Sequence, residues 1–575
     1  MNNLSVFESS GRESDIVESS RKLDDVMGSV QKSENKSNIL SEEARILLGE
    51  YEKGIQDEQD RASDSYIKVS EVLGSVAFIY ERIRNAVDYK GEHLLRRNAI
   101  ERILRRRIWE KRDENAEDTV EVLIRELIWS KYLKNNSVPK RKVLEIHRII
   151  SKYKRLFHLS ENGKNTPNVK SRELKDWFME IASSEIEETL DPDFYFREAL
   201  CKSLYFWFHG NFIWQDEGVS EDDKDVQIFI AIQRSFNKAD YPLLRYALLK
   251  VYYPQWSGVS ERRVDEIFPI VIEIRGEIER HLSTVIQPRM YRFVQKQTPA
   301  FLILKEALDG SKDNPNDLLM NSQKLEKKIR EICNKKYEEI RKKVNTGIKR
   351  SIIYIFATKI IFAFLIEIPY ELIFVEKLNF LSLSINITLP PILMFLVGLS
   401  IRKPGEENTQ RIINKIKSFI YNRDGNEKVS FSLLPKKRNR VLSQVFIFFY
   451  ALVFLLVFGG ISYLLLLAGF NLISAGIFFG FLSLVLLFSY RVRYTAGELN
   501  VTGEREGIIS HLFTNISLPF LNLGVWLSSG LSKLNFMLVI MDFLIESPLK
   551  NIIAVFEEWT SFIREKREEV VEVPN

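Results

Sequence analysis

Charged side chains are missing from the most apolar part of the sequence. Residues 441–490 contain no Asp, Glu, Lys or Arg, although charged residues make up 28% of the 575-residue chain. One helix of this length would extend roughly 75 Å, whereas the hydrocarbon core of a membrane is roughly 30 Å thick. The segment therefore has to cross, turn and return, which predicts a polytopic membrane protein and argues against a wholly soluble one.

Cysteine, glycine and proline are also scarce. The only two cysteines are Cys201 and Cys333, and neither belongs to a CxxC or Cys/His ligand spacing, so we expect neither a disulfide framework nor a zinc site. The chain has 26 Gly and 17 Pro and shows no sustained alternation of polar and apolar residues, which favours helices over strands. The predicted fold class is all-α: a polytopic α-helical membrane protein with a large N-terminal helical soluble domain.

Sequence motifs for catalysis are absent as well. The six histidines are dispersed, and no HExxH, GxGxxG or GxSxG motif occurs. The net charge of +5 is too small to indicate a nucleic-acid partner by itself, and no segment matches a nucleic-acid-binding module. We therefore expect no enzyme, no cofactor, no metal site and no nucleic-acid partner.

Changes in composition along the chain predict its domain organisation. In the N-terminal half, short apolar stripes at helical spacing alternate with polar breaks, and four strongly apolar spans follow. The predicted segments are a disordered arm (1–40), an all-helical cytoplasmic domain (41–321), a basic juxtamembrane helix (322–350), a first transmembrane hairpin (351–401), a basic cytoplasmic loop (402–440), a second transmembrane hairpin (441–490), amphipathic interfacial helices (491–556) and a charged tail (557–575).

The region after the fourth span has two interpretations. Residues 534–556 carry Asp542, Glu546 and Lys550 at four-residue intervals, which aligns these charges on one face of a helix. This pattern is typical of a helix that lies in the membrane interface. The alternative is a third hairpin, which would give six spans and leave the C-terminus on the same side.

Two predicted helices of the soluble half could contact or enter the membrane. Residues 194–214 form its most aromatic segment, which we interpret as a central core helix, with an interfacial helix as the alternative. Residues 323–350 carry an apolar stripe and run without proline into the first span. They predict a continuous helix from the domain into the bilayer, with Gly347 as the only hinge.

Basic residues flank the spans on one side. Residues 401–440 hold eleven Lys or Arg against four acids, Lys349 and Arg350 precede the first span, and two arginines follow the fourth. In the connections at the other ends of the spans, Lys377 is the only basic residue. By the positive-inside rule we expect an integral protein of a bacterial-type inner membrane, with both termini and the helical domain in the cytoplasm.

Three ionisable side chains interrupt the spans: Lys359, Glu367 and Glu371, all in the first. A charge at the bilayer centre costs about 2.5–3.5 kcal/mol on insertion scales, so these residues are candidates for an ion or proton path. The preferred interpretation is simpler: the acids lie close enough to the outer boundary to reach water, and Lys359 extends its long stem to the interface.

The soluble half contains one strongly basic stretch, 91–112. We interpret this stretch as a solvated face with some ion pairs, with contact to anionic lipid or a protein partner as the alternative, and the basic loop is a second candidate surface for such contact. The candidate contact residues are Arg96, Arg97, Arg102, Arg105, Arg106, Arg107, Lys436, Lys437 and Arg438.

The leading hypothesis for function is a membrane-tethered helical scaffold or assembly component that presents a cytoplasmic interaction domain. Its expected partners are anionic membrane lipids and either a protein partner or a second copy of the chain. The alternative hypothesis is a channel or small-transporter subunit in which Lys359 lies in the membrane path.

Overall fold

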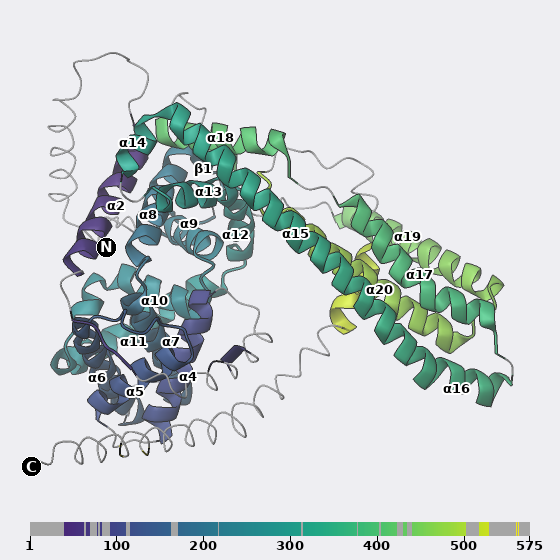
Figure 1. Ribbon diagram of the computed structural model, residues 1–575, viewed down its shortest axis with the longest axis horizontal. Helices are drawn as coiled ribbons and strands as arrows, with labels where there is room; N and C mark the ends of the chain where they lie inside the picture. The colour runs from purple at the N-terminus through teal and green to yellow at the C-terminus, as the bar shows by residue number, and fades with distance from the viewer. Residues whose placement is uncertain are drawn as a thin grey trace, which may run out of the picture.

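An elongated bundle of apolar helices extends from a larger helical domain in the computed structural model of the chain (Figure 1). The structure describes residues 40–61, 65–69, 78, 81–82, 92–110, 115–162, 171–216, 218–311, 314–376, 378–401, 404–421, 429–433, 440–501, 517–527, 559 and 562. This described part is mostly helical, as the all-α class predicts. All but the last residue of the predicted arm (1–40), most of 491–556 and nearly all of 557–575 lie outside it.

The helical domain is built around one hydrophobic core, which extends in sequence from Leu40 to Leu499. Its α-helices are α2 (Glu42–Arg61), α4 (Glu92–Glu110), α5 (Ala116–Trp129), α6 (Lys140–Asn162), α7 (Ser171–Leu190), α8 (Phe194–Asn211), α9 (Glu221–Phe236), α10 (Tyr241–Tyr252), α11 (Val264–Ser283), α12 (Gln287–Gln295), α13 (Thr298–Asp309) and α14 (Pro315–Met320). Two short 3₁₀ helices, η1 (Pro254–Gly258) and η2 (Glu261–Arg263), connect α10 to α11.

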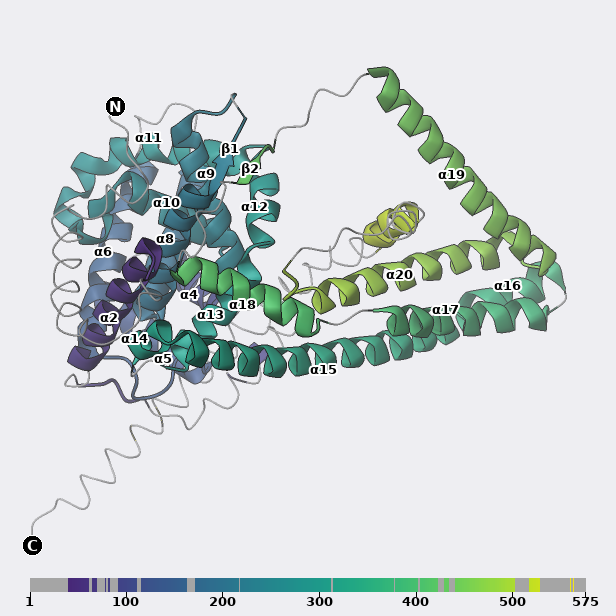
Figure 2. The same ribbon diagram turned by 90° about the horizontal axis from the view of Figure 1, so that it is seen from above.

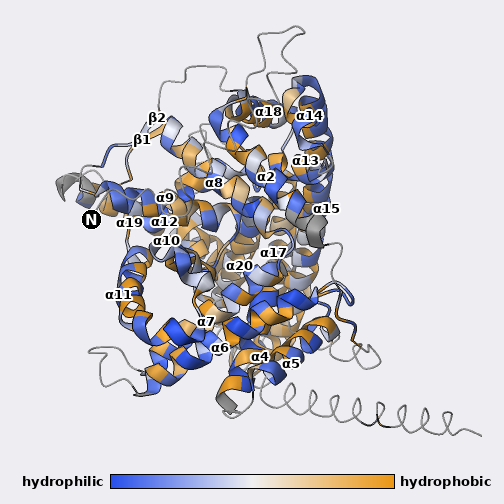
Figure 3. Ribbon diagram, turned by 90° about the vertical axis from the view of Figure 1, so that its left-hand side faces the viewer, coloured by the Kyte–Doolittle hydropathy of each residue, from blue (hydrophilic) through white to orange (hydrophobic). Residues whose placement is uncertain are grey.

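The domain helices are amphipathic, as the sequence periodicity predicts. In α5 the apolar side chains at helical spacing, including Val120, Leu123 and Leu127, are buried, whereas Glu117 and Asp118 occupy the exposed first turn. Figure 3 shows hydrophilic and hydrophobic residues mixed along each domain helix, so that one side of a helix is available for the core.

Helix α8 is a central core helix, which confirms the preferred interpretation of the aromatic segment. Phe196, Trp207 and Phe208 are buried, and the Trp207 ring centroid lies 5.0 Å from that of Phe301 in α13. The chain then forms β1 (Phe212–Trp214), which pairs in parallel with β2 (Val429–Phe431). This pair is the one sheet found among the described residues.

The segment predicted as a basic loop includes a helix, α18 (Glu406–Tyr421), that packs into the core of the domain. Its apolar residues recur at helical spacing, and Ile412, Ile416 and Phe419 are almost fully buried. The number of basic residues in 401–440 concealed this period: Arg411 and Lys417 lie beside the buried face of α18, and Lys415 extends over the buried ring of Trp207, 5.7 Å from its centroid.

Four helices of the described part are long and apolar enough to cross a membrane, at Ser322–Phe374, Phe380–Ser400, Gln444–Leu467 and Leu472–Ala496. Their elements are α15 (Ser322–Phe362), the π-helical turns η3 (Ala363–Glu367) and η4 (Glu371–Val375) with α16 (Ile368–Tyr370) between them, α17 (Phe380–Ser400), α19 (Arg440–Leu467) and α20 (Leu472–Ala496). A shorter apolar helix at Ser517–Leu527 contacts α19 and α20, because Phe520 stacks on Phe458 and Phe479.

Helix α15 joins the two parts of the molecule without a break. Asn321 caps its first turn, since the side-chain oxygen accepts hydrogen bonds from the backbone N–H groups of Gln323 and Lys324. Figure 2 shows α15 continuing alongside α17 and α20, while α19 diverges from them. The expected continuous helix is therefore present, and Gly347 lies within it without interrupting it.

Candidate functional site

A buried ion pair lies in the apolar bundle. The Nζ atom of Lys359 is 2.6 Å from Oε1 of Glu367, and the two side chains are 0% and 1% exposed. Lys359 is eight residues beyond Ser351, where the apolar span begins, which corresponds to roughly 12 Å along the helix. The pair is thus well inside the apolar part of the bundle.

The π-helical turn η3 helps to bring these two side chains together. In a regular α-helix, residues eight positions apart differ in direction by roughly 80°. A π turn contains more residues per turn, so it reduces this offset for the residues that follow. Glu367, the last residue of η3, consequently lies on the same buried side as Lys359.

Two further helices complete the enclosure of the pair. Asn386 of α17 donates hydrogen bonds from Nδ2 to Oε2 of Glu367, at 2.9 Å, and to the backbone carbonyl of Ser474 at the start of α20, at 3.3 Å. The Lys359 ammonium lies 4.8 Å from the ring centroid of Phe481, also in α20. The Oδ1 atom of Asn386 and the hydroxyl of Ser382 are buried without a hydrogen-bond partner.

Glu371 is held at the end of the bundle that lies away from the helical domain. Its Oε2 accepts a hydrogen bond from the backbone N–H of Asn379 at 3.0 Å, and its Oε1 accepts one from Nδ2 of Asn471 at 3.3 Å. Nδ2 of Asn379 also donates to the carbonyl of Gly469 at 3.1 Å, which ties the two connecting turns together.

The enclosure of these charges differs from the simpler interpretation of the sequence. The two acids do not reach the surface, since Glu367 is 1% and Glu371 3% exposed, and Lys359 pairs within the bundle instead of extending to its end. The turns fold over the acids and the neighbouring helices supply hydrogen-bond donors, which spacing along one segment does not reveal.

Sequence reasoning missed the three asparagines of this site. Asn386 was detectable, because it is the only Asn or charged residue in the apolar helix Phe380–Ser400. Asn379 and Asn471 also act as N-caps, accepting from the backbone N–H groups of Ser382 and Ser474. Their capping role is visible in the sequence, but their contact with Glu371 is not.

The arginines of α4 are occupied by acids of the same domain. The carboxylate partners, with the shortest N···O distances, are Glu187 for Arg96 (2.7 Å), Glu101 and Asp240 for Arg97 (2.8 and 3.0 Å), Glu81 for Arg102 (2.7 Å), Asp176 and Glu101 for Arg105 (2.5 and 2.7 Å) and Glu126 for Arg106 (2.5 Å). Arg107 is half-buried on the same helix, and Lys436, Lys437 and Arg438 lie outside the described residues. A docking role for these residues stays a prediction.

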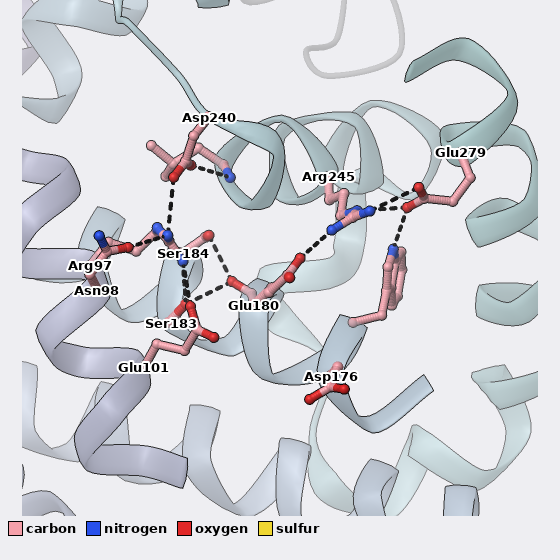
Figure 4. A network of polar contacts seen from close by, with 12 residues as sticks. Arg97, Asn98, Glu101, Asp176, Glu180, Ser183, Ser184, Asp240, Arg245 and Glu279 are labelled. Carbon is pink, nitrogen blue, oxygen red and sulfur yellow. Dashed lines mark hydrogen bonds and ion pairs between the residues drawn. The ribbon is translucent and has the colours of Figure 1, made fainter. Parts of the chain in front are cut away.

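These ion pairs join neighbouring helices of the domain. Figure 4 shows Arg97 linked to Asp240, and Arg245 of α10 placed between Glu180 of α7 and Glu279 of α11. The Arg245 guanidinium lies 2.6 Å from Glu279, and hydrogen bonding to Arg245 lowers the pKa of Glu279 although burial opposes this effect. The network therefore stabilises the packing of the domain.

Comparison with known proteins gives no relatives: no protein-family model, no curated protein and no solved structure matches the chain. Among the residues that the structure describes, no group of three or more His, Cys, Asp or Glu side chains is arranged to hold a metal ion. The polar site of the bundle is thus the feature from which we argue function.

Proposed function

We propose that the protein is a membrane channel or transporter subunit that moves protons or small cations, with Lys359, Glu367 and Glu371 along its path. The observation that carries this proposal is the enclosed contact between Lys359, Glu367 and Asn386 among apolar helices. Ionisable groups inside a membrane are costly and are characteristic of ion and proton pathways. Apolar side chains of similar volume would pack at least as stably, so stability alone gives no reason for the charges.

The positions of the acids suit a stepwise path. Glu367 and Glu371 lie roughly 24 and 30 Å beyond Ser351 along the helix, so they form a series from the inside of the bundle to its far end. On the domain side, Ile355, Met394, Phe481 and Val485 form a buried apolar cluster. This cluster closes the path in the state described here, and conduction requires α15, α17 and α20 to separate at that level.

The proposal is tested with purified protein in liposomes that contain a pH-sensitive dye. Glu367→Gln and Lys359→Met should each reduce proton or cation flux at least about tenfold, whereas Thr358→Val, at the adjacent half-exposed position, should leave it unchanged. Replacing one partner leaves the other charge buried and costs about 3–5 kcal/mol, so each single variant can also lose structure.

A double variant separates these two effects. Lys359→Met with Glu367→Leu removes both charges, so it should fold close to normally and still lack flux. Normal flux through a folded double variant, or no flux through the wild type with H⁺, Na⁺ or K⁺, contradicts the proposal.

For orientation, we propose that the helical domain lies in the cytoplasm and that the protein resides in an inner-type membrane. Both connecting turns meet at the end of the bundle away from the domain, joined by the hydrogen bond between Asn379 and Gly469. The basic residues at 349–350 and 491–493 belong to the other end of the bundle, next to the domain. This asymmetry supports the positive-inside expectation.

The scaffold remains a second candidate, favoured by the way the domain is fixed to the bundle. Asn408 of α18 donates to the carbonyl of Leu499, at 2.8 Å, and accepts from the N–H of Val501, at 2.9 Å, directly after α20. The domain is thus attached to the bundle through α15, α18 and the end of α20. A scaffold that holds a partner at a fixed position on the membrane requires such an attachment. Tagged full-length protein, purified in mild detergent, should then retain a stoichiometric protein partner, and purification without one contradicts this role.

A further inference from the structure

The helical domain contains a cleft of about 480 Å³, formed by α2, α4, α7, α8, α9 and α10. This volume is within the range of small-molecule sites, roughly 300–1,000 Å³. Aromatic residues Phe194, Phe229 and Tyr246 contribute apolar surface, and charged residues from several helices surround it. The cleft belongs to a different part of the molecule from the polar site of the bundle.

The cations of the cleft already have carboxylate partners. The Lys250 ammonium is 2.6 Å from Glu188, that of Lys202 is 3.1 Å from Glu50, and Arg197 pairs with Asp191. Lys53 lies 3.6 Å from Glu50 and is largely exposed. An anionic ligand would have to displace one of these carboxylates, so the cleft is poorly suited to phosphate or a dicarboxylate.

Three hydrogen-bond acceptors of the cleft lack a matching donor, and on the donor side Nε of Arg197 is buried there without an acceptor. Glu198 forms no ion pair within the described residues, and its one polar contact there is a hydrogen bond of 3.5 Å that it accepts from Nε2 of Gln233. Nε2 of His93 and Oδ1 of Asn237 are buried without a hydrogen-bond partner. Burial and the nearby charge of Arg197 lower the pKa of His93 to about 4, so its ring is neutral at pH 7.

The backbone of Asn237 acts on the imidazole in the opposite direction to burial and raises its pKa, as a carbonyl that accepts the ring proton does. A ring that donates its proton to a carbonyl through one nitrogen presents a lone pair on the other. His93 Nε2, Asn237 Oδ1 and the Glu198 carboxylate therefore all require N–H donors, and the carboxylate also requires a positive charge.

We propose that this cleft binds a small organic molecule with an ammonium or guanidinium group, whose charged N–H donors meet Glu198 and Asn237, away from the cations beside His93, while its carbon chain packs on Phe229. A bound amine would complete the unmet hydrogen bonds and pair directly with Glu198, which no described residue salt-bridges and on which the Lys250 ammonium acts only from a distance. The proposal does not depend on ion transport by the bundle, because binding is measured without a membrane gradient.

The test is isothermal titration calorimetry on the full-length protein in detergent, with agmatine, spermidine and L-arginine as probes. At least one probe should bind saturably, and Glu198→Gln should weaken it at least about tenfold, because it removes the charged partner. Ala247→Phe, which fills the cleft without changing its charge, should abolish binding. Glu145→Gln on α6, outside the cleft, is the matched control and should bind normally.

Two further ligands sharpen the result. Tetramethylammonium carries the positive charge but no N–H donor, and inorganic phosphate carries the opposite charge, so neither should bind. The proposal is overturned if phosphate binds and the amines do not, if no amine binds up to about 10 mM, or if amine binding is the same in the wild type, Glu198→Gln and Ala247→Phe. If Glu198→Gln does not fold, Ala247→Phe decides the outcome.

Discussion

Two lysines are enclosed almost completely, and each has an acid within hydrogen-bonding distance. In the helical domain, Lys152 is 2.7 Å from Glu185 and also donates to the carbonyl of Trp256 at 3.1 Å. In the bundle, Lys359 is 2.6 Å from Glu367. Burial lowers the pKa of Lys152 although Glu185 opposes this effect. The domain pair has further donors around it, whereas the bundle pair depends on Asn386.

Gly469 occupies a turn that another side chain would distort. Its φ is +76°, and a Cβ atom there would lie 2.3 Å from Nδ2 of Asn379, which caps α17. We expect Gly469→Ala to destabilise the protein by about 1–3 kcal/mol, measured as a lower thermal unfolding temperature in detergent. Gly476→Ala is the control, because a Cβ at this helical position meets no atom within 4 Å. Equal unfolding temperatures for the two variants would refute this account of the turn.

Glu187 should make the stability of the domain depend on pH. Burial raises its pKa from 4.5 to about 7, although Arg96 opposes this effect. The folded state therefore binds the proton more tightly than the unfolded state, so the stability contributed by this group is greatest below pH 4.5 and decreases up to about pH 7. Between these pH values, the unfolding free energy of the wild type should fall relative to Glu187→Gln by on the order of 3 kcal/mol.

The measurement is thermal or denaturant unfolding of both proteins at several pH values. Their difference cancels the other titrating groups, and Glu173→Gln on the exposed part of α7 serves as the control variant. A difference between wild type and Glu187→Gln that stays constant from pH 4.5 to pH 8 would show that the carboxyl titrates normally.

At the scale of whole elements, amphipathic periodicity was the reliable sequence signal. It predicted a helical domain and the continuous helix at α15, because buried residues recur every three or four positions, as in α5 and α15. It did not reveal the π-helical turns η3 and η4, since an apolar span has no polar face whose shift would mark them. Helix α18 was missed for a different reason: its segment was interpreted as a loop because it contains many basic residues.

Helix α15 offers a direct test of its own rigidity. A Cβ at Gly347 would meet only Val492 Cγ2, at an ordinary distance of 3.5 Å. Gly347→Ala should therefore raise the unfolding free energy by about 0.5–1 kcal/mol, because alanine loses less backbone freedom in a helix. The measurement is the thermal unfolding temperature in detergent.

Gly398 in α17 is the matched comparison for this substitution. A Cβ there would lie 2.9 Å from Cγ2 of Ile348, so Gly398→Ala should not share the gain. A lower unfolding temperature for Gly347→Ala would mean that the helix bends at this residue after all.

At the scale of the molecule, the sequence predicted two parts but not how they are joined. The apolar spans and the helical domain follow from composition. The shared core that includes α18 and the residues after α20 depends on contacts between residues far apart in sequence, such as Tyr337 with Asn408. The same holds for the cleft and for the ion pairs of α4, whose partners come from separate helices.

The proposed orientation is open to labelling, because both native cysteines, Cys201 and Cys333, are buried. Leu472 begins α20 at the end of the bundle away from the domain and is 88% exposed, and Val285 in the domain is 76% exposed. In intact spheroplasts, a membrane-impermeant maleimide should label Leu472→Cys but not Val285→Cys, which should react only after permeabilisation. The reverse pattern would invert the topology, and labelling of both positions from one side would show that the bundle does not cross the membrane.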